Sequence, residues 1–349
     1  MPGPRAPRRS SRRPGRRTTP HWLAVVLLLT LTGCAGTQGA GGSDTAGSTE
    51  VRFAMTSRVA GFWPLYIAQQ KGFFQQEGVD LKIITVAQSS VQSQVLLSGS
   101  VDVVSGTPDG MLLARSRGED VVAVAAFRNA PVASLVVSKD VKSLGDLKGK
   151  RIAVSEPTGS DSFFVREMLR SAGLTERDYQ LVTVGGTPNR AAALESGGVA
   201  ASLLDQPQDF VLARKGFRRL ANTMDHVRDY AWSWVTVRGG WAKQNKESLV
   251  RFLCGLRTGS AWFYDPANRE EAIDILAQEL GVSAADAGDT YELWVRVREL
   301  APGMQPSAAG LEQLQRFMTS NKRFEGAAPP APSTFIDLAY LEEAAKRCP

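Results

Sequence analysis

The sequence predicts an α/β fold in which two α/β units are followed by a helical tail. Between residues 51 and 238, short apolar runs alternate with amphipathic stretches, as in strands joined by helices in a mostly parallel sheet. After residue 163 the apolar residues recur close to the 3.6-residue period of a helix that faces a sheet. Beyond residue 238 the chain reads as long helices, which must pack on one of the two units.

The first unit begins with a β-rich stretch and a loop that carries two large aromatic residues, Phe62 and Trp63. Pro64 suits the first turn of the helix that follows this loop. We expect strands at 51–56, 79–86, 100–106, 121–127 and 133–139, and helices at 64–76, 90–97 and 108–117.

The second unit is organised around residues 142–170. A strand at 151–155 ends before a turn that contains Thr158, Gly159 and Ser160, and a helix follows. Strand, tight turn and helix start would direct backbone N–H groups and two hydroxyls at one spot, which suits an anionic or strongly polar ligand atom. The alternative is an ordinary capped helix, because Thr and Ser are common N-caps.

The remaining elements follow the same pattern. Strands are expected at 179–184, 199–205, 217–222 and 231–238, and helices at 188–197 and 207–214. The tail is expected to form helices at 240–263, 268–280, 284–300, 310–320 and 338–346, with a Pro-rich segment at 328–332.

The first 33 residues are expected to be an export signal. Seven arginines precede ten mostly apolar residues at 22–31, a run too short to span a bilayer, which takes about 20 residues. The doubled arginines leave both the general secretory route and the twin-arginine route open. Residues 35–50 are nearly all Gly, Ala, Ser and Thr, so we expect 34–50 to act as a flexible tether.

Charge excludes one class of partner. The net charge of +6 comes from this leader, because without its seven arginines the 41 basic residues fall to 34 against 35 acidic ones. No nucleic-acid partner is therefore expected. His226 is the one histidine after the leader, so neither an imidazole metal site nor a metal cofactor is expected. In an oxidising compartment Cys254 and Cys348 could pair, or they could remain free thiols.

Several stretches resemble known families. Residues 31–34, LTGC, resemble the lipobox of bacterial lipoproteins, which implies that Cys34 is acylated and anchors the chain at the outer face of the cytoplasmic membrane. The stretches 63–80, 97–103 and 144–154 resemble periplasmic-type substrate-binding proteins for nitrate, sulfonate, taurine and thiamine-pyrimidine precursors. This second resemblance covers roughly Val51 to Ala345.

The resemblance implies a two-lobed periplasmic-binding-protein fold of type II, with two mixed sheets, flanking helices and a ligand cleft between the lobes. Lobe one would combine 51–137 with 236–349, and lobe two would be 138–235. The lobes would be joined by crossing strands near 135–138 and 235–238.

Ligands of such sheets bind at the carboxyl ends of strands, so the following loops supply the candidate ligand contacts. These candidates are Ser57, Arg58, Phe62, Trp63, Gln88, Ser89, Thr107, Asp109, Thr158, Gly159, Ser160, Asp205, Gln206 and Trp232.

Each candidate has a plainer alternative. Arg58 could be a solvated loop charge, and the two aromatics could pack on the first helix. Gln88, Ser89, Thr107 and Asp109 could only start or cap helices. Asp205 could pair with Arg214, and because Trp232 alternates with Trp234, one of the two faces a core.

The resemblance implies a lipid-anchored, monomeric solute receptor that delivers a small molecule to the membrane permease of an ABC importer. Its ligand would be a sulfonate-, taurine- or nitrate-like anion or a pyrimidine-type heterocycle, and the sequence does not choose between them. An enzyme acting on a small heterocycle is the first alternative, although the cysteine-rich motif of the enzymatic fungal branch is absent. A surface lipoprotein that binds a protein partner is the second alternative.

Overall fold

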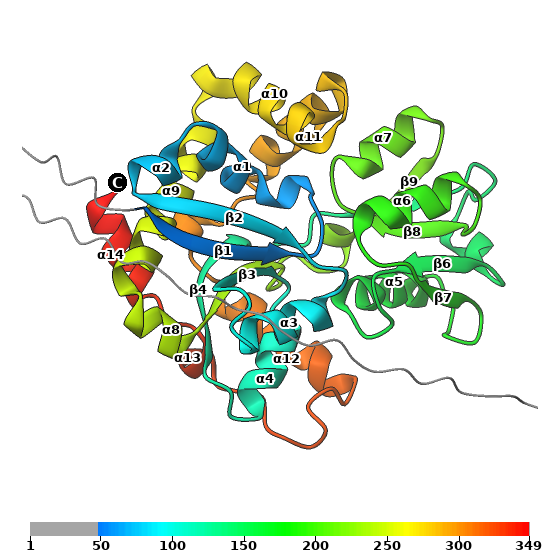
Figure 1. Ribbon diagram of the computed structural model, residues 1–349. Helices are drawn as coiled ribbons and strands as arrows, with labels where there is room; N and C mark the ends of the chain where they lie inside the picture. Colours follow the sequence, from blue (N-terminus) through cyan, green and yellow to red (C-terminus); the bar gives the residue numbers. More distant parts are fainter. Residues whose placement is uncertain (1–47, 349) are drawn as a thin grey trace, which may run out of the picture. The chain divides into compact units, whose positions relative to one another are not determined.

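The computed structural model describes residues 48–348. These residues contain two five-stranded sheets, one ordered β2-β1-β3-β10-β4 and the other β7-β6-β8-β5-β9 (Figure 1). The first of these sheets, together with the helices that cover it, is called the first lobe. The second sheet and its helices are called the second lobe. Both sheets are mixed, as the resemblance implied.

The first sheet is parallel except for β10, which runs antiparallel to both of its neighbours. Alternate residues of β1 face opposite sides, so that Phe53 packs into one apolar core and Ala54 into another. Its strands are β1 (Thr49–Met55), β2 (Val79–Thr85), β3 (Val103–Gly106), β4 (Val121–Arg128) and β10 (Ser233–Arg238).

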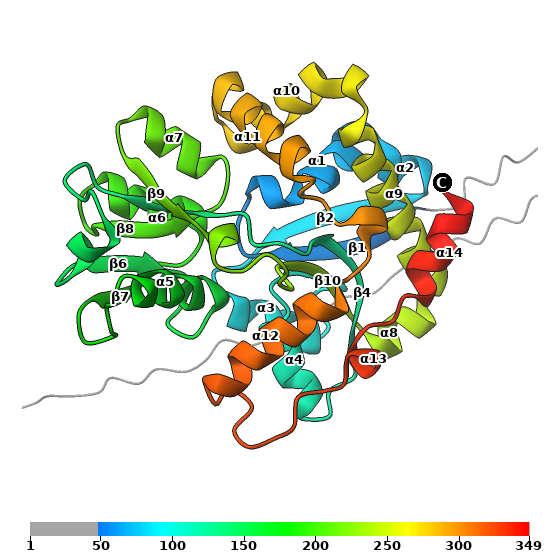
Figure 2. The same ribbon diagram turned by 180° about the vertical axis from the view of Figure 1, so that it is seen from behind.

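Helices cover both faces of the first sheet. One group shares a core with Phe53: α1 (Trp63–Gln70), α2 (Phe73–Gln76), α9 (Lys246–Tyr264), α10 (Arg269–Leu280), α11 (Ala284–Val297) and α14 (Ala339–Arg347). The other group shares a core with Ala54: α3 (Ser89–Leu97), α4 (Asp109–Ser116), α12 (Ala308–Ser320) and α13 (Pro332–Phe335) (Figure 2). The helical tail therefore packs on both sides of the first sheet.

The second sheet is built from one stretch of chain. Its strands are β5 (Ser134–Val137), β6 (Arg151–Val154), β7 (Gln180–Thr183), β8 (Ala201–Leu204) and β9 (Arg218–Asn222). Leu135 and Ile152 share a core with α5 (Ser160–Ser171), whereas Val136 and Ala153 face the side covered by α6 (Thr187–Glu195) and α7 (Gln208–Arg214).

Two long helices expected from the sequence are divided. The helix expected at 64–76 is split into α1 and α2 because Gly72 adopts a left-handed conformation with φ 74°. The helix expected at 240–263 is split at Asn245, which ends α8 (Gly239–Gln244) and precedes α9. Periodicity continues across both breaks, so the apolar pattern alone did not reveal them.

The links between the lobes differ from the crossing strands that the resemblance implied. Residues 134–137 form β5 of the second sheet, and residues 233–238 form β10 of the first. The chain therefore crosses between the lobes at 129–133 and 223–232. The two links are held together, because the Tyr230 amide donates to the Asn129 carbonyl at 2.8 Å and the Thr223 amide donates to the Ala133 carbonyl at 3.0 Å. The other expected domain boundaries remain a prediction.

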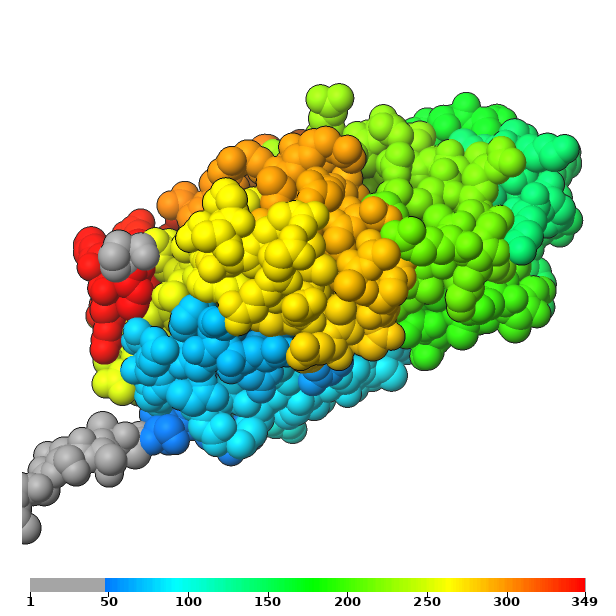
Figure 3. Space-filling model, turned by 90° about the horizontal axis from the view of Figure 1, so that it is seen from above, coloured from blue at the N-terminus to red at the C-terminus, as the bar shows by residue number. Residues whose placement is uncertain are grey.

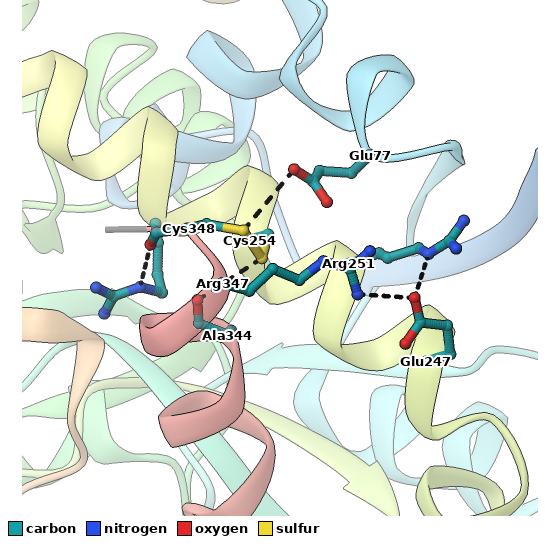
Figure 4. The surroundings of a disulfide bond; sticks show 8 residues. Glu77, Glu247, Arg251, Cys254, Ala344, Arg347 and Cys348 are labelled. Atoms are coloured by element: carbon teal, nitrogen blue, oxygen red, sulfur yellow. Dashed lines mark hydrogen bonds and ion pairs between the residues drawn. A yellow bond between two sulfur atoms is a disulfide. The ribbon is translucent and has the colours of Figure 1, made fainter.

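Cys254 and Cys348 are joined by a disulfide, with 5.5 Å between their Cα atoms. This bond ties α9 to the end of α14 (Figure 4). Beside it, Glu247 accepts from both Arg251 and Arg347, each at 2.7 Å.

Cys34 and the expected leader lie outside the described residues. Among residues 48–348, every helix is too short or too polar to cross a membrane.

Candidate functional site

A cavity of about 100 Å³ lies between the two lobes. It is lined by the loops at the carboxyl ends of β1, β2, β3 and β4 and of β6, β7 and β8, where ligands of open α/β sheets bind. A more open hollow of about 610 Å³ shares Ser57, Gln88 and Gly186 with the cavity and continues it outward. Because both lobes contribute to the lining, one solute in the cavity would touch both.

Most of the residues predicted from strand ends line this cavity. They are Ser57, Phe62, Gln88, Ser89, Thr107 and Asp109 from the first lobe, Gly159, Ser160 and Asp205 from the second, and Trp232 from the second link. Their contact with a ligand remains a prediction.

Two of the candidates in the first lobe lie elsewhere. Arg58 forms an ion pair with Glu279 and lines the more open hollow instead of the cavity itself. Trp63 is fully buried, and its indole N–H donates to the Ala272 carbonyl at 2.9 Å. It packs against Phe263 and Trp294, so the plainer alternative of helix packing holds for Trp63.

Two candidates in the second lobe are also displaced. Thr158 is exposed, and its carbonyl accepts a hydrogen bond from Arg323. Gln206 is buried; its side-chain amide donates to Asp209 at 3.1 Å, and its backbone carbonyl accepts from the Ala60 amide at 3.1 Å. Gln206 therefore links the lobes instead of lining the space between them.

Of the two alternating tryptophans, Trp232 lines the cavity. Trp234 is fully buried, and its indole N–H donates to the Asn129 side chain at 2.9 Å. Trp232 precedes β10 (Ser233–Arg238), so the pleat of that strand, which places residues two apart on the same face, does not set the direction of its side chain.

The start of α5 carries its own anion. Asp161 accepts from the Ser155 amide at 2.5 Å, from the Ser155 hydroxyl at 2.7 Å and from the Ser162 amide at 2.9 Å. A solute anion at this helix start would therefore meet a carboxylate. The donors that Asp161 satisfies belong to Ser155 and Ser162, and its carboxylate also pairs with Arg190 at 3.7 Å, so the anion site suggested for the turn at 158–160 stays a prediction.

Asp109, at the first turn of α4, is 3% exposed and lines the cavity. Among the described residues, its Oδ1 atom has no hydrogen-bond partner. Burial raises the pKa of Asp109, and the Arg323 guanidinium only partly opposes this shift.

Arg128, which was not predicted as a site residue from the sequence, joins three parts of the chain at the cavity. Its guanidinium pairs with Asp205 of the second lobe and with Glu299 of the tail, each at 3.2 Å. Burial raises the pKa of Glu299 to about 8, against the opposing effect of Arg128. Arg128 directly follows the apolar strand expected at 121–127, so the rule of strand ends could have found it.

Two residues of α6, Thr187 and Arg190, were also not predicted as site residues from the sequence. Arg190 donates to the carbonyls of Gly185 at 2.6 Å and Leu203 at 3.0 Å and to the Thr187 hydroxyl at 3.1 Å. Thr187 in turn approaches Asp205 at 3.5 Å. These contacts fix the start of α6 against β8 and shape one wall of the cavity.

Residues 60–269 match a family described as "NMT1/THI5 like". The chain belongs to this family. The match covers the second sheet, the first sheet apart from β1, and most of the residues that line the cavity of this NMT1/THI5-like protein.

Related proteins align with different fractions of the length of this NMT1/THI5-like chain. A "Putative thiamine biosynthesis protein" of Haemophilus influenzae is 32% identical over 34% of this chain and only 38% of its own length. A "Putative binding protein" of Brucella abortus is 26% identical over 65% of this chain and 72% of its own. A 4-amino-5-hydroxymethyl-2-methylpyrimidine phosphate synthase of Aspergillus parasiticus is 28% identical over 37% of this chain and 38% of its own.

Solved structures share the fold. The alkanesulfonate-binding protein of Xanthomonas axonopodis pv. citri has a TM-score of 0.68 at 19% identity, covering 84% of this chain and 100% of its own. The periplasmic nitrate-binding protein of Synechocystis has a TM-score of 0.67 at 18% identity, covering 85% and 88%. At these identities the likeness describes the two-lobed fold and leaves the ligand open.

Proposed function

We propose that this protein is an extracytoplasmic solute-binding receptor that delivers a small organic solute to an ABC importer. The observation that carries the proposal is the cavity between the lobes, whose lining comes from strand ends of both sheets. A solute that contacts both lobes binds the closed form better than the open one and shifts the population toward closure. The name of the Brucella relative and the fold of the solute-binding neighbours support this proposal.

The proposal includes the lipid anchor at Cys34, which is motivated by the LTGC stretch that follows an apolar run. A Cys34→Ala variant should leave the membrane fraction, because it lacks the two acyl chains that would anchor the parent protein firmly. A variant that stays as firmly bound as the parent protein would contradict the anchor.

Ligand binding can be followed through Trp232, which lines the cavity. We expect titration calorimetry and tryptophan fluorescence with panels of small sulfonates, nitrate and aminopyrimidines to identify a ligand. Gln88→Ala in the first lobe and Gly159→Val in the second should each weaken its binding. Asp274→Asn, an exposed residue of α10 outside the cavity, should not. Equal affinity in all three variants would place the site elsewhere.

An enzyme is the second candidate, because the Aspergillus relative is named a synthase. Recovery of the bound compound unchanged after prolonged incubation distinguishes a receptor from an enzyme. Conversion of the compound would overturn the receptor proposal.

A further inference from the structure

A partly buried carboxylate lies against the disulfide that ties α9 to the end of α14. The Oε1 atom of Glu77, which directly follows α2, is 3.8 Å from the Cys348 sulfur (Figure 4). The sulfurs of Cys254 and Cys348 and a carboxylate oxygen of Glu77 all lie within 4.8 Å of one another. Three residues far apart in the sequence therefore bring two sulfurs and one carboxylate oxygen to one place.

The disulfide gives the Glu77 carboxylate no donor. A sulfur in a disulfide carries no hydrogen, so Cys348 cannot donate to Glu77 while the bond is intact. Two arginines lie nearby, but Arg251 and Arg347 both pair with Glu247 (Figure 4). In the described part of the chain, no basic side chain forms an ion pair with Glu77. This carboxylate therefore faces the sulfurs without a partner of its own.

Reduction changes what the two sulfurs can bind. A dithiol reductant transfers two electrons and two protons, the bond between the sulfurs breaks, each sulfur becomes a thiol, and the dithiol leaves as a disulfide. The new thiols face acceptors that are already in place. The Cys254 sulfur lies 3.8 Å from the Ala344 carbonyl, and the Cys348 sulfur lies at the same distance from Glu77. Once deprotonated, the two sulfurs are soft metal ligands beside a carboxylate.

We propose that Cys254, Cys348 and Glu77 bind a thiophilic divalent cation such as Zn²⁺ when the disulfide is reduced. Two thiolates and one carboxylate supply three ligands of a tetrahedral Zn²⁺ ion, water supplies the fourth, and the two thiol protons are released. Mg²⁺ and Ca²⁺ are not expected to bind, because they prefer oxygen ligands. The site uses no imidazole, so the scarcity of histidine does not argue against it. This inference is independent of the solute-receptor function proposed above.

The positions of the three ligands allow them to adjust to a metal ion. Two thiolates of one tetrahedral Zn²⁺ ion lie roughly 3.7 Å apart, given Zn–S bonds of about 2.3 Å, so the sulfurs must separate after reduction. Cys254 is fully buried within α9 and provides a fixed sulfur. Cys348 follows the last residue of α14 and Glu77 follows the last residue of α2. Both lie at helix ends, where local rearrangement costs least.

Neighbouring guanidinium groups offset the charge of such a site. Two thiolates and a carboxylate around a divalent cation leave one unit of negative charge. Arg347 precedes Cys348 in the chain, and the Arg257 side chain donates to the Cys348 carbonyl at 3.3 Å. Positive charge beside the sulfurs favours their thiolate forms, which are the forms that bind a metal ion.

The test uses the intact protein, reduced with dithiothreitol in the absence of oxygen, freed of reductant and checked for two free thiols. Co²⁺ is the probe, because tetrahedral Co²⁺ bound to thiolates absorbs by charge transfer from sulfur and by d–d transitions. We expect one Co²⁺ ion per reduced molecule with both absorptions, and loss of both when Zn²⁺ displaces Co²⁺. The oxidised protein should show neither absorption.

Variants of the reduced protein identify the ligands. Glu77→Gln should weaken Co²⁺ binding at least about tenfold, because even residues that only orient a metal ligand contribute that much. The charge-transfer absorption should remain in this variant, since both thiolates remain. Replacing Cys254 and Cys348 together by Ala should abolish that absorption. Glu312→Gln, at an exposed position of α12, is the matched control and should bind Co²⁺ as the parent does.

Thermal melting gives a second readout that does not depend on cobalt. Zn²⁺ should raise the melting temperature of the reduced protein, because it binds the folded site, and should leave the oxidised protein unchanged. A folded, reduced protein without the sulfur-to-cobalt absorption would overturn the proposal. Equal Co²⁺ affinity of the Glu77→Gln and parent proteins would also overturn it, as would a reduced protein that unfolds and is not restored by Zn²⁺.

Discussion

At the residue scale, Arg128 shows how a single side chain can join distant parts of the chain. Its guanidinium lies 5.9 Å from the ring of Trp232 and 5.5 Å from that of Trp294, and it pairs with Asp205 and Glu299. The partners are separated from Arg128 by 77 and 171 residues, so no local pattern announces them. The ends of the strands could be predicted from the sequence. The ion pairs that form between charged residues at those ends depend on the tertiary fold and could not.

The Glu299 carboxyl should make stability depend on pH. Its pKa is 4.5 as a free group and about 8 in the folded protein, so the folded state holds the proton more tightly. Its stabilising contribution is therefore full below about pH 4.5 and is lost as pH rises toward 8, by at most about 1.4 kcal/mol per pH unit.

Glu299→Gln should accordingly flatten the fall in the free energy of unfolding between pH 5 and 8, measured by chemical denaturation. Glu312→Gln, at an exposed site on α12, is the control and should keep the parental slope. An unchanged slope in the Glu299 variant would show that this group does not carry the dependence.

At the element scale, alternating apolar runs predicted nearly every strand and helix, because each must bury one face against its neighbours. The breaks at Gly72 and Asn245 were missed because they change backbone direction without changing composition. Trp63 was misplaced for a related reason. A loop aromatic looks the same in sequence whether it faces a ligand or the next helix, and only the position of α9 and α11 places it in a core.

The disulfide between α9 and α14 should contribute to stability. It closes a loop spanning 94 residues, for which the chain-entropy model gives up to roughly 4–5 kcal/mol. Replacing Cys254 and Cys348 together by Ala should therefore lower the melting temperature clearly, and reductant should lower that of the parent protein but not that of the variant. Equal melting of both proteins in oxidising buffer would contradict this contribution.

At the scale of the whole molecule, ion pairs outside the cavity also join the second lobe to the helical tail. Arg214, at the end of α7, pairs with Asp286 at 2.7 Å and with Asp289, both on α11. Figure 3 shows this helical tail in contact with the second lobe. The contact was not predicted, because the sequence suggested Asp205 as the partner of Arg214, whereas Asp205 pairs with Arg128.

Arg214→Gln should shift the ligand-free protein toward an open form. Since Arg214 is 45% exposed, its ion pairs are worth about 0.2–1 kcal/mol, and solute affinity should fall by no more than about fivefold. Small-angle scattering should show a larger radius of gyration. Arg269→Gln removes ion pairs with Glu270 and Glu292 inside the tail and is the matched control. Identical scattering from both variants would mean that Arg214 does not hold the lobes together.

The route of the chain between the sheets has a consequence for how such proteins can change. The whole second sheet is made from an uninterrupted stretch, and its incoming and outgoing links are hydrogen-bonded to each other. The second lobe is thus a cassette with two adjacent junctions inserted into the first. Recombination at those two points could exchange half of the cleft in one event while leaving the first lobe intact.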